Sequence, residues 1–309
     1  MNNYMTDLRL KAILLLYKIL YKIKPRYAGE LMYRRAFHRP MDLDNPKNLI
    51  EKIYWLQYNS DTSMWTLCAD KYRVREYVEK CGLLEYMPKL YGHWEEPELI
   101  DFNSLPDEFV LKANNGCGTV KIVRDKSQLD TKATVKILKK WLKVPFGYEG
   151  GQSHYLKIKP CIIAEELLHE DENLNNKMEA PRSLTDYKIW CFEGKPECIL
   201  VIHDRVGKGY LMDMYDTEWN RIPNSLKRNA HYGVTEEKVL RPKCLKQMLM
   251  MASKLSEPFT ELRVDFYVIN NKPVIGELTF SSGYGNYTEE FYDYLGSKVD
   301  LSHVIKAKK

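Results

Sequence analysis

The sequence predicts an α+β fold, in which antiparallel hairpins and helices follow one another along the chain. Two observations carry this prediction. Apolar runs of strand length come in pairs around short turns, and segments with helical spacing separate those pairs. The chain has 309 residues, more than one small domain needs, so we expect two or three subdomains that share one site.

The first predicted element is an N-terminal helix. Its unbroken apolar run from Ala12 to Tyr17 is far too short to span a bilayer, and no small-residue cleavage site of a signal peptide follows it. A narrow and mostly basic stripe runs along the helix: Asp7, Lys11, Lys18, Lys22 and Arg26. Two interpretations stay open, a helix packed on the domain and a helix lying on an anionic membrane surface.

Helices are also predicted over 47–58 and 63–80, where the apolar residues recur with helical spacing. Gly82 supplies a stop just past the second of these helices. The segment 95–106 is acidic and punctuated by proline, which predicts a linker between the first two subdomains.

The middle of the chain predicts a small sheet with a helix beside it. Strands over 109–114 and 119–125 flank a short loop, and an amphipathic helix follows over 128–143. Residues 144–160 hold three glycines and no period, which predicts a mobile loop. The continuous apolar start of 161–168 is typical of a strand in a sheet covered on both faces.

The last part of the chain predicts two hairpins and an interrupted helix. Two strands joined by a Gly-Lys-Pro turn are expected within 186–204, and a further strand within 210–223. Helical spacing over 236–257 breaks near Pro242. Residues 262–280 alternate between apolar and polar around a short turn, which predicts a second hairpin.

Composition restricts the classes of protein that remain. The seven cysteines are an odd number without CxxC spacing, and several stand inside apolar strand patterns. This indicates reduced core residues in a cytoplasmic protein and argues against a zinc site. The formal net charge of +5 is too small to indicate nucleic-acid binding by itself, and none is expected.

The first candidate site is a lysine beside a loop of small residues. Lys112 ends an apolar strand, and the loop that follows contains Asn115, Gly116, Gly118 and Thr119. An ammonium and loop amides can approach the same phosphate, because glycines leave room for it. The Walker A order is absent, and a plain hairpin with an exposed lysine is the alternative. We expect the ammonium to be unpaired until an anion binds.

The second candidate site lies on the last hairpin. Alternation along its strands places Asp265 and Glu277 on one face, with Arg263 beside them. Converging carboxylates without a nearby thiol or imidazole suit a hard cation such as Mg²⁺, which also binds phosphate oxygens. A cluster of ion pairs on a sheet face is the alternative.

A third, weaker pattern is the strand at 161–168, which runs out into acidic residues. Backbone groups at the exit of such a strand can bind adenine, and a carboxylate can hold ribose hydroxyls. Apolar strands often end in acidic residues, so this pattern indicates a nucleotide site only in combination with the other two candidate sites.

Together these segments stand in an order that resembles the TupA-like ATP-grasp family, which is associated with bacterial surface-polymer genes such as those of teichuronopeptide biosynthesis. The resemblance runs from about Asn48 to Gly285 and implies an ATP-grasp fold with an N-terminal helical and α/β subdomain (1–105), a small nucleotide lid (106–164) and a C-terminal subdomain (165–309). The matching segments are "NLIEKIYWLQ", "ADKYRVREYV", "LPDEFVLKANNGCG", "KPCIIAEELL", "DYKIWCFEGKPE" and "RVDFYVINNKPVIGELTFSSGYG".

The resemblance also implies roles for single residues. The phosphates of ATP would contact Lys71 and Lys112, and the mobile loop that covers them would contain Asn115, Gly116, Gly118 and Thr119. The hinge that lines adenine would consist of Glu165, Glu166 and Leu168, and the carboxylate that holds the ribose hydroxyls would be Asp186. Lys188 and Arg263 would face the reacting phosphoryl group or substrate, and Asp265 and Glu277 would bind Mg²⁺. Many ATP-grasp ligases have Asn where this chain has Thr279, which puts a second metal position in doubt.

The implied reaction joins a carboxylate to an amine through an acyl phosphate, with ATP and Mg²⁺ as cofactors. The expected partners are a small-molecule or glycan carboxylate, such as a sugar acid or an amino acid of a surface polysaccharide, and an amine acceptor. The expected location is cytoplasmic, with contact to the inner membrane face if the N-terminal helix binds lipid. The alternatives are a phosphotransferase acting on a glycan hydroxyl, a metal-dependent glycosyltransferase and a non-catalytic nucleotide sensor.

Overall fold

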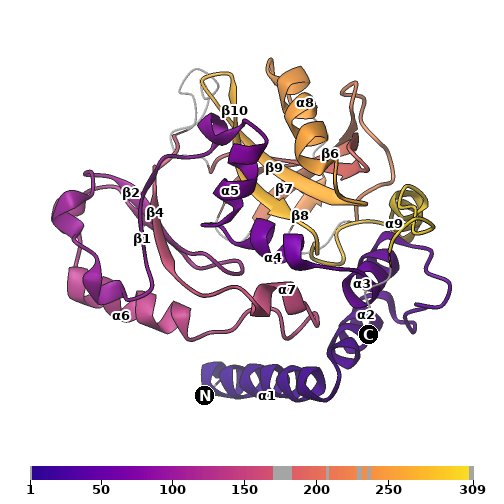
Figure 1. The fold of residues 1–309 in the computed structure, drawn as a ribbon, viewed down its shortest axis with the longest axis horizontal. Coiled ribbons are helices and arrows are strands. Elements are labelled where there is room, and N and C mark those ends of the chain that lie inside the picture. The colour runs from indigo at the N-terminus through magenta and orange to yellow at the C-terminus, as the bar shows by residue number, and fades with distance from the viewer. Residues whose placement is uncertain (1, 170–182, 207–208, 228–231, 235–237, 306–309) are drawn as a thin grey trace.

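The computed structural model describes two mainly antiparallel sheets that lie on opposite sides of the molecule, with helices around them (Figure 1). This arrangement confirms the predicted α+β class. The structure describes residues 2–169, 183–206, 209–227, 232–234 and 238–305, and the side chains of residues 2–11, 205, 206, 232 and 234 lie outside the described set.

Helices form the N-terminal part: α1 (Asn2–Ile23), α2 (Pro25–Phe37), α3 (Leu49–Asn59), α4 (Ser63–Ala69), α5 (Val74–Lys80) and the short 3₁₀ turn η1 (Leu84–Tyr86). The long helix expected over 63–80 is two helices. Asp70 interrupts it, because its Oδ1 accepts hydrogen bonds from the backbone N–H groups of Tyr72 and Arg73 and so stabilises a turn. Pro25 occupies the first turn of α2, so Arg26 belongs to α2 and not to the stripe of α1.

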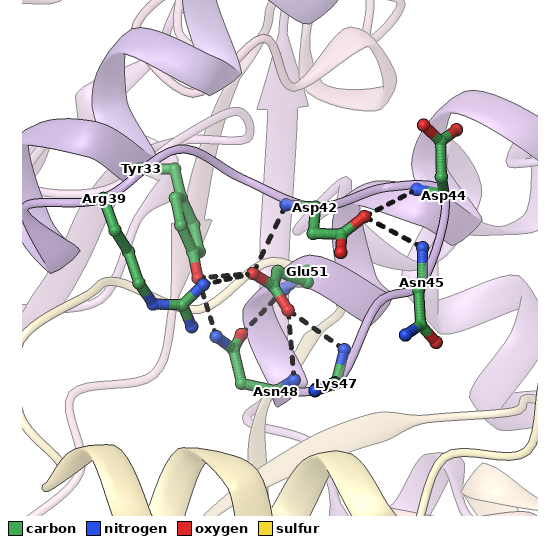
Figure 2. A network of polar contacts seen from close by, with 8 residues as sticks. All are labelled: Tyr33, Arg39, Asp42, Asp44, Asn45, Lys47, Asn48 and Glu51. Carbon is green, nitrogen blue, oxygen red and sulfur yellow. Dashed lines mark hydrogen bonds and ion pairs between the residues drawn. The ribbon is translucent and has the colours of Figure 1, made fainter.

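A buried carboxylate organises the start of α3 (Figure 2). Glu51 is 1% exposed and accepts hydrogen bonds from Tyr33 Oη at 2.7 Å and Arg39 Nη1 at 2.7 Å. Its other oxygen accepts from the backbone N–H of Lys47 at 3.0 Å, and Asn48 completes a capping box. Burial raises the pKa of Glu51, but these donors outweigh it and hold the pKa below its usual value. The "NLIEKIYWLQ" segment is therefore a capped helix start.

The smaller sheet has the strand order β1–β4–β2–β3 and is antiparallel throughout. Its elements are β1 (Leu90–Trp94), β2 (Phe109–Ala113), β3 (Val120–Val123) and β4 (Ile162–Glu165), with η4 (Lys126–Gln128) and α6 (Thr131–Leu142) following β3. Leu138 of α6 packs in one core with Phe109 and Leu111 of β2. The helix α7 (Ser153–Leu156) lies in the segment expected to be a mobile loop, and Gln152 at its start donates a hydrogen bond to Ser281 Oγ.

The predicted linker at 95–106 is wrong. This segment forms the 3₁₀ turns η2 (Pro97–Leu99) and η3 (Phe102–Ser104). Ile100, Phe102 and Leu105 are buried in the same core as Leu138, so the segment is part of the small sheet's packing. Because β1 pairs with β4, this sheet also draws residues from before position 106.

The larger sheet has the order β10–β9–β5–β6–β7–β8, in which only the β7–β8 pair is parallel. Its strands are β5 (Asp186–Phe192), β6 (Lys195–Val206), β7 (Gly209–Asp216), β8 (Tyr232–Val234), β9 (Leu262–Ile269) and β10 (Lys272–Thr279). Helix α8 (Leu245–Ser256) contacts β5, β6 and β9, and α9 (Glu289–Ser297) contacts α3. Of the helical spacing over 236–257, only α8 is helical, after Pro242; residues 236 and 237 lie outside the described set.

Candidate active site

The β9–β10 hairpin sets the position of the two candidate metal ligands. Its turn residues Asn270 and Asn271 both have positive φ, 51° and 59°, as a type I′ turn requires. The resulting register pairs Glu277 with Asp265 and Thr279 with Arg263, beyond an irregularity near Gly276. The two carboxylates thus come from directly paired positions, as the alternation predicts.

Asp265 is buried between two cations. Its Oδ1 accepts from Arg263 Nε at 2.7 Å, and its Oδ2 accepts from Arg263 Nη2 at 2.9 Å and from Lys188 Nζ at 2.5 Å. Lys188 reaches it because β5 pairs with β9 so that Lys188 and Asp265 are register partners. Burial raises the pKa of Asp265, but the charges of Arg263 and Lys188 outweigh it and lower the pKa, so the carboxyl group is ionised. The ion pair of the alternative interpretation is therefore present.

The two carboxylates still have room for a cation. Each carboxylate oxygen carries two lone pairs, and Asp265 Oδ1 uses one of them. The Glu277 side chain is 30% exposed, and its Oε1 accepts from Lys71 Nζ at 3.3 Å, while its second oxygen has no hydrogen bond among the described residues. Mg²⁺ is commonly held by one or two carboxylates plus phosphate oxygens, which fits this pair. Thr279 Oγ1 is occupied by Arg263 Nη2 at 3.2 Å and fits a ligand role less well.

Lys71 joins the glycine-containing loop to this carboxylate pair. It lies in the turn between α4 and α5, and its Nζ donates to the carbonyl oxygen of Gly116 at 2.5 Å as well as to Glu277. Gly116 and Gly118 both have positive φ, 75° and 78°. The loop closes where the Ala113 N–H donates to the carbonyl of Thr119 at 3.2 Å, and Asn115 within it is buried. The structure thus brings Lys71 and the loop, which the resemblance assigns to phosphate binding, next to Glu277, which it assigns to Mg²⁺.

Asn114 is a residue of this region that sequence reasoning missed. It is fully buried, and its Nδ2 donates to Asp70 Oδ1 at 2.9 Å and to the carbonyl of Lys159 at 3.0 Å. Its Oδ1 accepts from Cys161 N at 2.8 Å, and its carbonyl accepts the N–H of Lys71 at 2.9 Å. These bonds tie the end of β2 to the turn that carries Lys71. The signal in the sequence is a polar residue between an apolar strand and a loop. This pattern alone does not distinguish a buried residue that links two segments by hydrogen bonds from an exposed turn residue.

Lys112 is not unpaired, so that expectation is wrong. Its Nζ donates to Glu165 Oε2 at 2.7 Å, and Arg75 Nη2 donates to Glu165 Oε1 at 2.8 Å. The Glu165 side chain is only 6% exposed. The pairing follows from the sheet, because β2 and β4 are neighbours and Lys112 pairs with Ile163, two residues from Glu165, so both side chains lie on the same face. Arg75, on α5, is a second residue that sequence reasoning missed.

The other residues assigned to nucleotide binding lie close to these strands. Glu166 is exposed, and its Oε2 accepts the backbone N–H of Lys89 at 3.2 Å, at the start of β1. Leu168 is half-buried beyond the end of β4. Asp186 is buried at the first position of β5, with Oδ1 3.7 Å from Lys188 Nζ. Main-chain pairing within the two sheets positions Glu165 and Asp186.

Gly116→Val is expected to weaken ATP binding by about tenfold or more. A Cβ at Gly116 would lie 2.5 Å from Cγ of Phe146, and its φ of 75° disfavours any L side chain. The loop must then shift away from Lys71. Calorimetric titration with ATP measures the effect, beside the melting temperature of the free protein.

Gly118→Ala is the matched control, because Gly118 has a similar φ but nothing lies within 4 Å of a Cβ built there. It should show the backbone strain without the clash, and a smaller loss of affinity. If Gly116→Val binds ATP as tightly as wild type, the loop is only a turn.

The fold is similar to those of solved ligases. The D-alanine–D-alanine ligase from Bacillus anthracis aligns with a TM-score of 0.50 at 16% identity, over 82% of this chain and 74% of that one. The same enzyme complexed with ATP aligns with a TM-score of 0.48 at 15% identity, over 78% and 68%. The L-amino acid ligase from Bacillus licheniformis aligns with a TM-score of 0.42 at 15% identity, over 72% and 44%. No relative matches among curated proteins.

A family model gives the closer assignment. The model described as "TupA-like ATPgrasp" matches residues 51–300. That range takes in both sheets and all the residues around Asp265, Glu277 and Lys112. Since the match covers most of the chain and agrees with the ATP-grasp fold of the structure, the chain belongs to the TupA-like ATP-grasp family.

Proposed function

We propose that the protein is an ATP- and Mg²⁺-dependent ligase that joins a carboxylate to an amine through an acyl phosphate. The observation that carries this proposal is the contact of Lys71 with both Gly116 and Glu277. This contact joins the candidate phosphate loop to the carboxylate pair. A triphosphate lying along the loop would therefore end beside Asp265 and Glu277, the candidate Mg²⁺ ligands. The family and the ATP-grasp fold support ATP as the energy source.

The binding roles that the family resemblance implies are compatible with the positions of these side chains. The adenine would lie at the exit of β4, beside Glu165, Glu166 and Leu168, with Asp186 near the ribose. The phosphates would lie between Lys71, Lys112 and the loop of residues 115–119. Mg²⁺, held by Asp265 and Glu277, would neutralise charge on the phosphate oxygens when bound.

The chain's own residues would align the reactants and balance charge, and no nucleophilic side chain is required. A substrate carboxylate oxygen attacks the γ-phosphorus, the bond to the β-phosphate oxygen breaks, and ADP leaves. A neutral amine then attacks the acyl carbon, inorganic phosphate leaves, and the nitrogen loses a proton. Arg263 and Lys188 are the cations nearest to the carboxylate pair, so they would hold the transferred phosphoryl group or the substrate carboxylate.

The substrates are proposed from the family's association with surface polymers. One would be a sugar acid and the other an amino acid, within the synthesis of a bacterial surface polysaccharide. A screen of ADP release that pairs amino acids with uronic acids tests this, with mass spectrometry of the product. An amide product supports the ligase. Phosphate retained on a glycan hydroxyl would show the phosphotransferase, and no ADP release with any pair would argue against these substrates.

A cytoplasmic protein held at the inner membrane face is proposed for the location. Within the described part of the chain, no helix is long and apolar enough to cross a membrane. Helix α1 packs through Tyr17, which is buried, but Leu15, Ile19 and Ile23 are 57%, 48% and 67% exposed. These three recur every four residues and so share one face of the helix. Their neighbours Lys18 and Lys22 are exposed too, which suits an anionic lipid surface. Asp7 and Lys11 of the predicted stripe have side chains outside the described set.

Deleting the residues before Lys24 should reduce sedimentation with vesicles that contain anionic lipid. Lys18→Gln together with Lys22→Gln should reduce it in part, as should raised salt, because part of the attraction is electrostatic. Neutral vesicles are the control. If the full chain does not sediment with anionic vesicles in low salt, α1 serves packing alone.

A further inference from the structure

Helix α6 carries a stripe of lysines outside the nucleotide site. They line an open groove of about 450 Å³ beside η2, together with Glu98 and Val135. The lysines of the stripe are Lys132, Lys136, Lys139, Lys140 and Lys143. All five are exposed, and the helical period of 3.6 residues places them within about 100° of the helix circumference.

The stripe faces away from the small sheet. The buried residues of α6 are Thr134 and Leu138, which lie on the opposite side of the helix from the lysines. Packing therefore explains the apolar face of α6 and leaves the lysine face without a structural partner from the sheet. In Figure 1, α6 lies at the outer edge of the molecule, beyond β1, β2 and β4.

The fold does not account for so many like charges on one face. Lysines four residues apart repel one another and destabilise a helix, and Lys132 in the first turn is also opposed by the helix dipole. Helix α6 itself contains no acidic residue. Among the described residues, only Lys139 of the five has an ion pair, with Glu98. The five positive charges of the stripe equal the formal net charge of the whole chain, +5, so the charges of the remaining residues sum to zero.

We propose that the groove along α6 binds an acidic glycan chain, a polymer with carboxylates on successive sugars, and holds it on the lid. This rests on the proposed function and specifies its carboxylate substrate as a polymer. A row of ammonium groups along about three turns of helix suits a repeating anion better than a single small one. Among the residues that the structure describes, no aromatic side chain or arginine lines the groove, so it offers neither stacking for bases nor planar contacts to phosphate. The groove also lacks the large apolar side chains that insert into a membrane, which α1 exposes instead.

The test measures binding of the full chain to fluorescent polygalacturonate. In the triple variant Lys132→Gln, Lys136→Gln and Lys140→Gln, the affinity should fall at least tenfold. The negative slope of log K against log[NaCl] should become shallower by about 2–3, because fewer counterions are released on binding. The control triple variant Lys243→Gln, Lys246→Gln and Lys254→Gln removes the same charge from exposed lysines at and near α8 and should change the affinity less than twofold.

Further arms separate this proposal from a fold defect and from the ligase proposal. The stripe variant should melt at the wild-type temperature or slightly above, because lysine repulsion is relieved. It should also show the wild-type thermal shift with ATP. Polymer binding through these lysines without ADP release in the presence of any amino acid would argue against the proposed substrates and leave the groove assignment standing. Three results would overturn the groove proposal. The first is an equal loss of affinity in the two triple variants, and the second is no binding of the polymer by wild type. The third is binding of duplex DNA or anionic vesicles through these lysines as tightly as the polymer.

Discussion

Glu277→Gln is expected to lower the rate of ADP release by two to three orders of magnitude or more while leaving the protein folded. The substitution removes a negative charge at a partly exposed position, and a glutamine oxygen can still accept the hydrogen bond from Lys71. What is lost is a negatively charged ligand for Mg²⁺, which would stabilise charge that develops on the phosphate oxygens, and one such interaction is worth about 2.7–4 kcal/mol. The measurement is steady-state ADP release at saturating Mg²⁺, beside a thermal melt.

Asp265→Asn should abolish turnover as well, but it should also destabilise the fold. Asp265 is buried, and both of its oxygens accept hydrogen bonds from Arg263 or Lys188. Removing its charge leaves two cations without their counterion, and breaking a buried pair in this way costs about 3–5 kcal/mol. The two variants therefore separate a loss of chemistry from a loss of structure.

Glu290→Gln on α9 is the control for charge, because Glu290 is exposed in the first turn of a helix outside the hairpin. It should behave as wild type in both measurements. Turnover near the wild-type rate in both Asp265→Asn and Glu277→Gln would contradict the assignment of these carboxylates to Mg²⁺ and phosphate.

Lys112→Ala should weaken ATP binding by about 1.5–3 kcal/mol, or roughly tenfold to a hundredfold, because a charge-assisted contact to phosphate is lost. It should also lower the stability of the free protein. Its ammonium is one of two donors to the buried Glu165, which would then be left with Arg75 alone. The expected loss is about 1–3 kcal/mol. Calorimetric titration with ATP and a denaturant melt measure the two effects separately.

Lys112→Arg should restore part of each effect, since a planar guanidinium can reach a carboxylate but does not replace a compact ammonium at a phosphate. Lys121→Ala is the matched control on the neighbouring strand. Its register partner is Leu111, so it faces the other side of the sheet from Lys112. An equal thermal shift with ATP in Lys112→Ala, Lys112→Arg and wild type would show that Lys112 does not contact the nucleotide.

Local patterns made the hairpin and the loop predictable. Alternation along β9 and β10, with two asparagines at the turn, determines which side chains share a face, so Asp265 and Glu277 could be paired from the sequence. The same holds for the loop around Gly116, because positive φ at closely spaced positions selects glycine. These features depend on residues close together in the chain or across one tight turn.

Sequence reasoning failed where the partner lies far along the chain. It took 95–106 for a linker, because proline and acidic residues dominate its composition, whereas Ile100, Phe102 and Leu105 are buried under α6. It predicted an unpaired Lys112, because the ion-pair partner of this lysine, Glu165, lies 53 residues away along the chain. A partner of this kind is set by which strands become neighbours in the sheet, and a single sequence carries no local signal for that choice.

By itself the sequence determined the α+β class, most of the helices and strands, and the faces on which the candidate site residues lie, because backbone propensity and side-chain alternation act over a few residues. Only the tertiary structure decided how charge is balanced within the site. The neighbouring strands β5 and β9 bring Lys188 to Asp265, and the α4–α5 turn brings Lys71 to Glu277, 206 residues away. Electrostatic interactions depend on distance and burial in space, and these are known only once the sheets have formed.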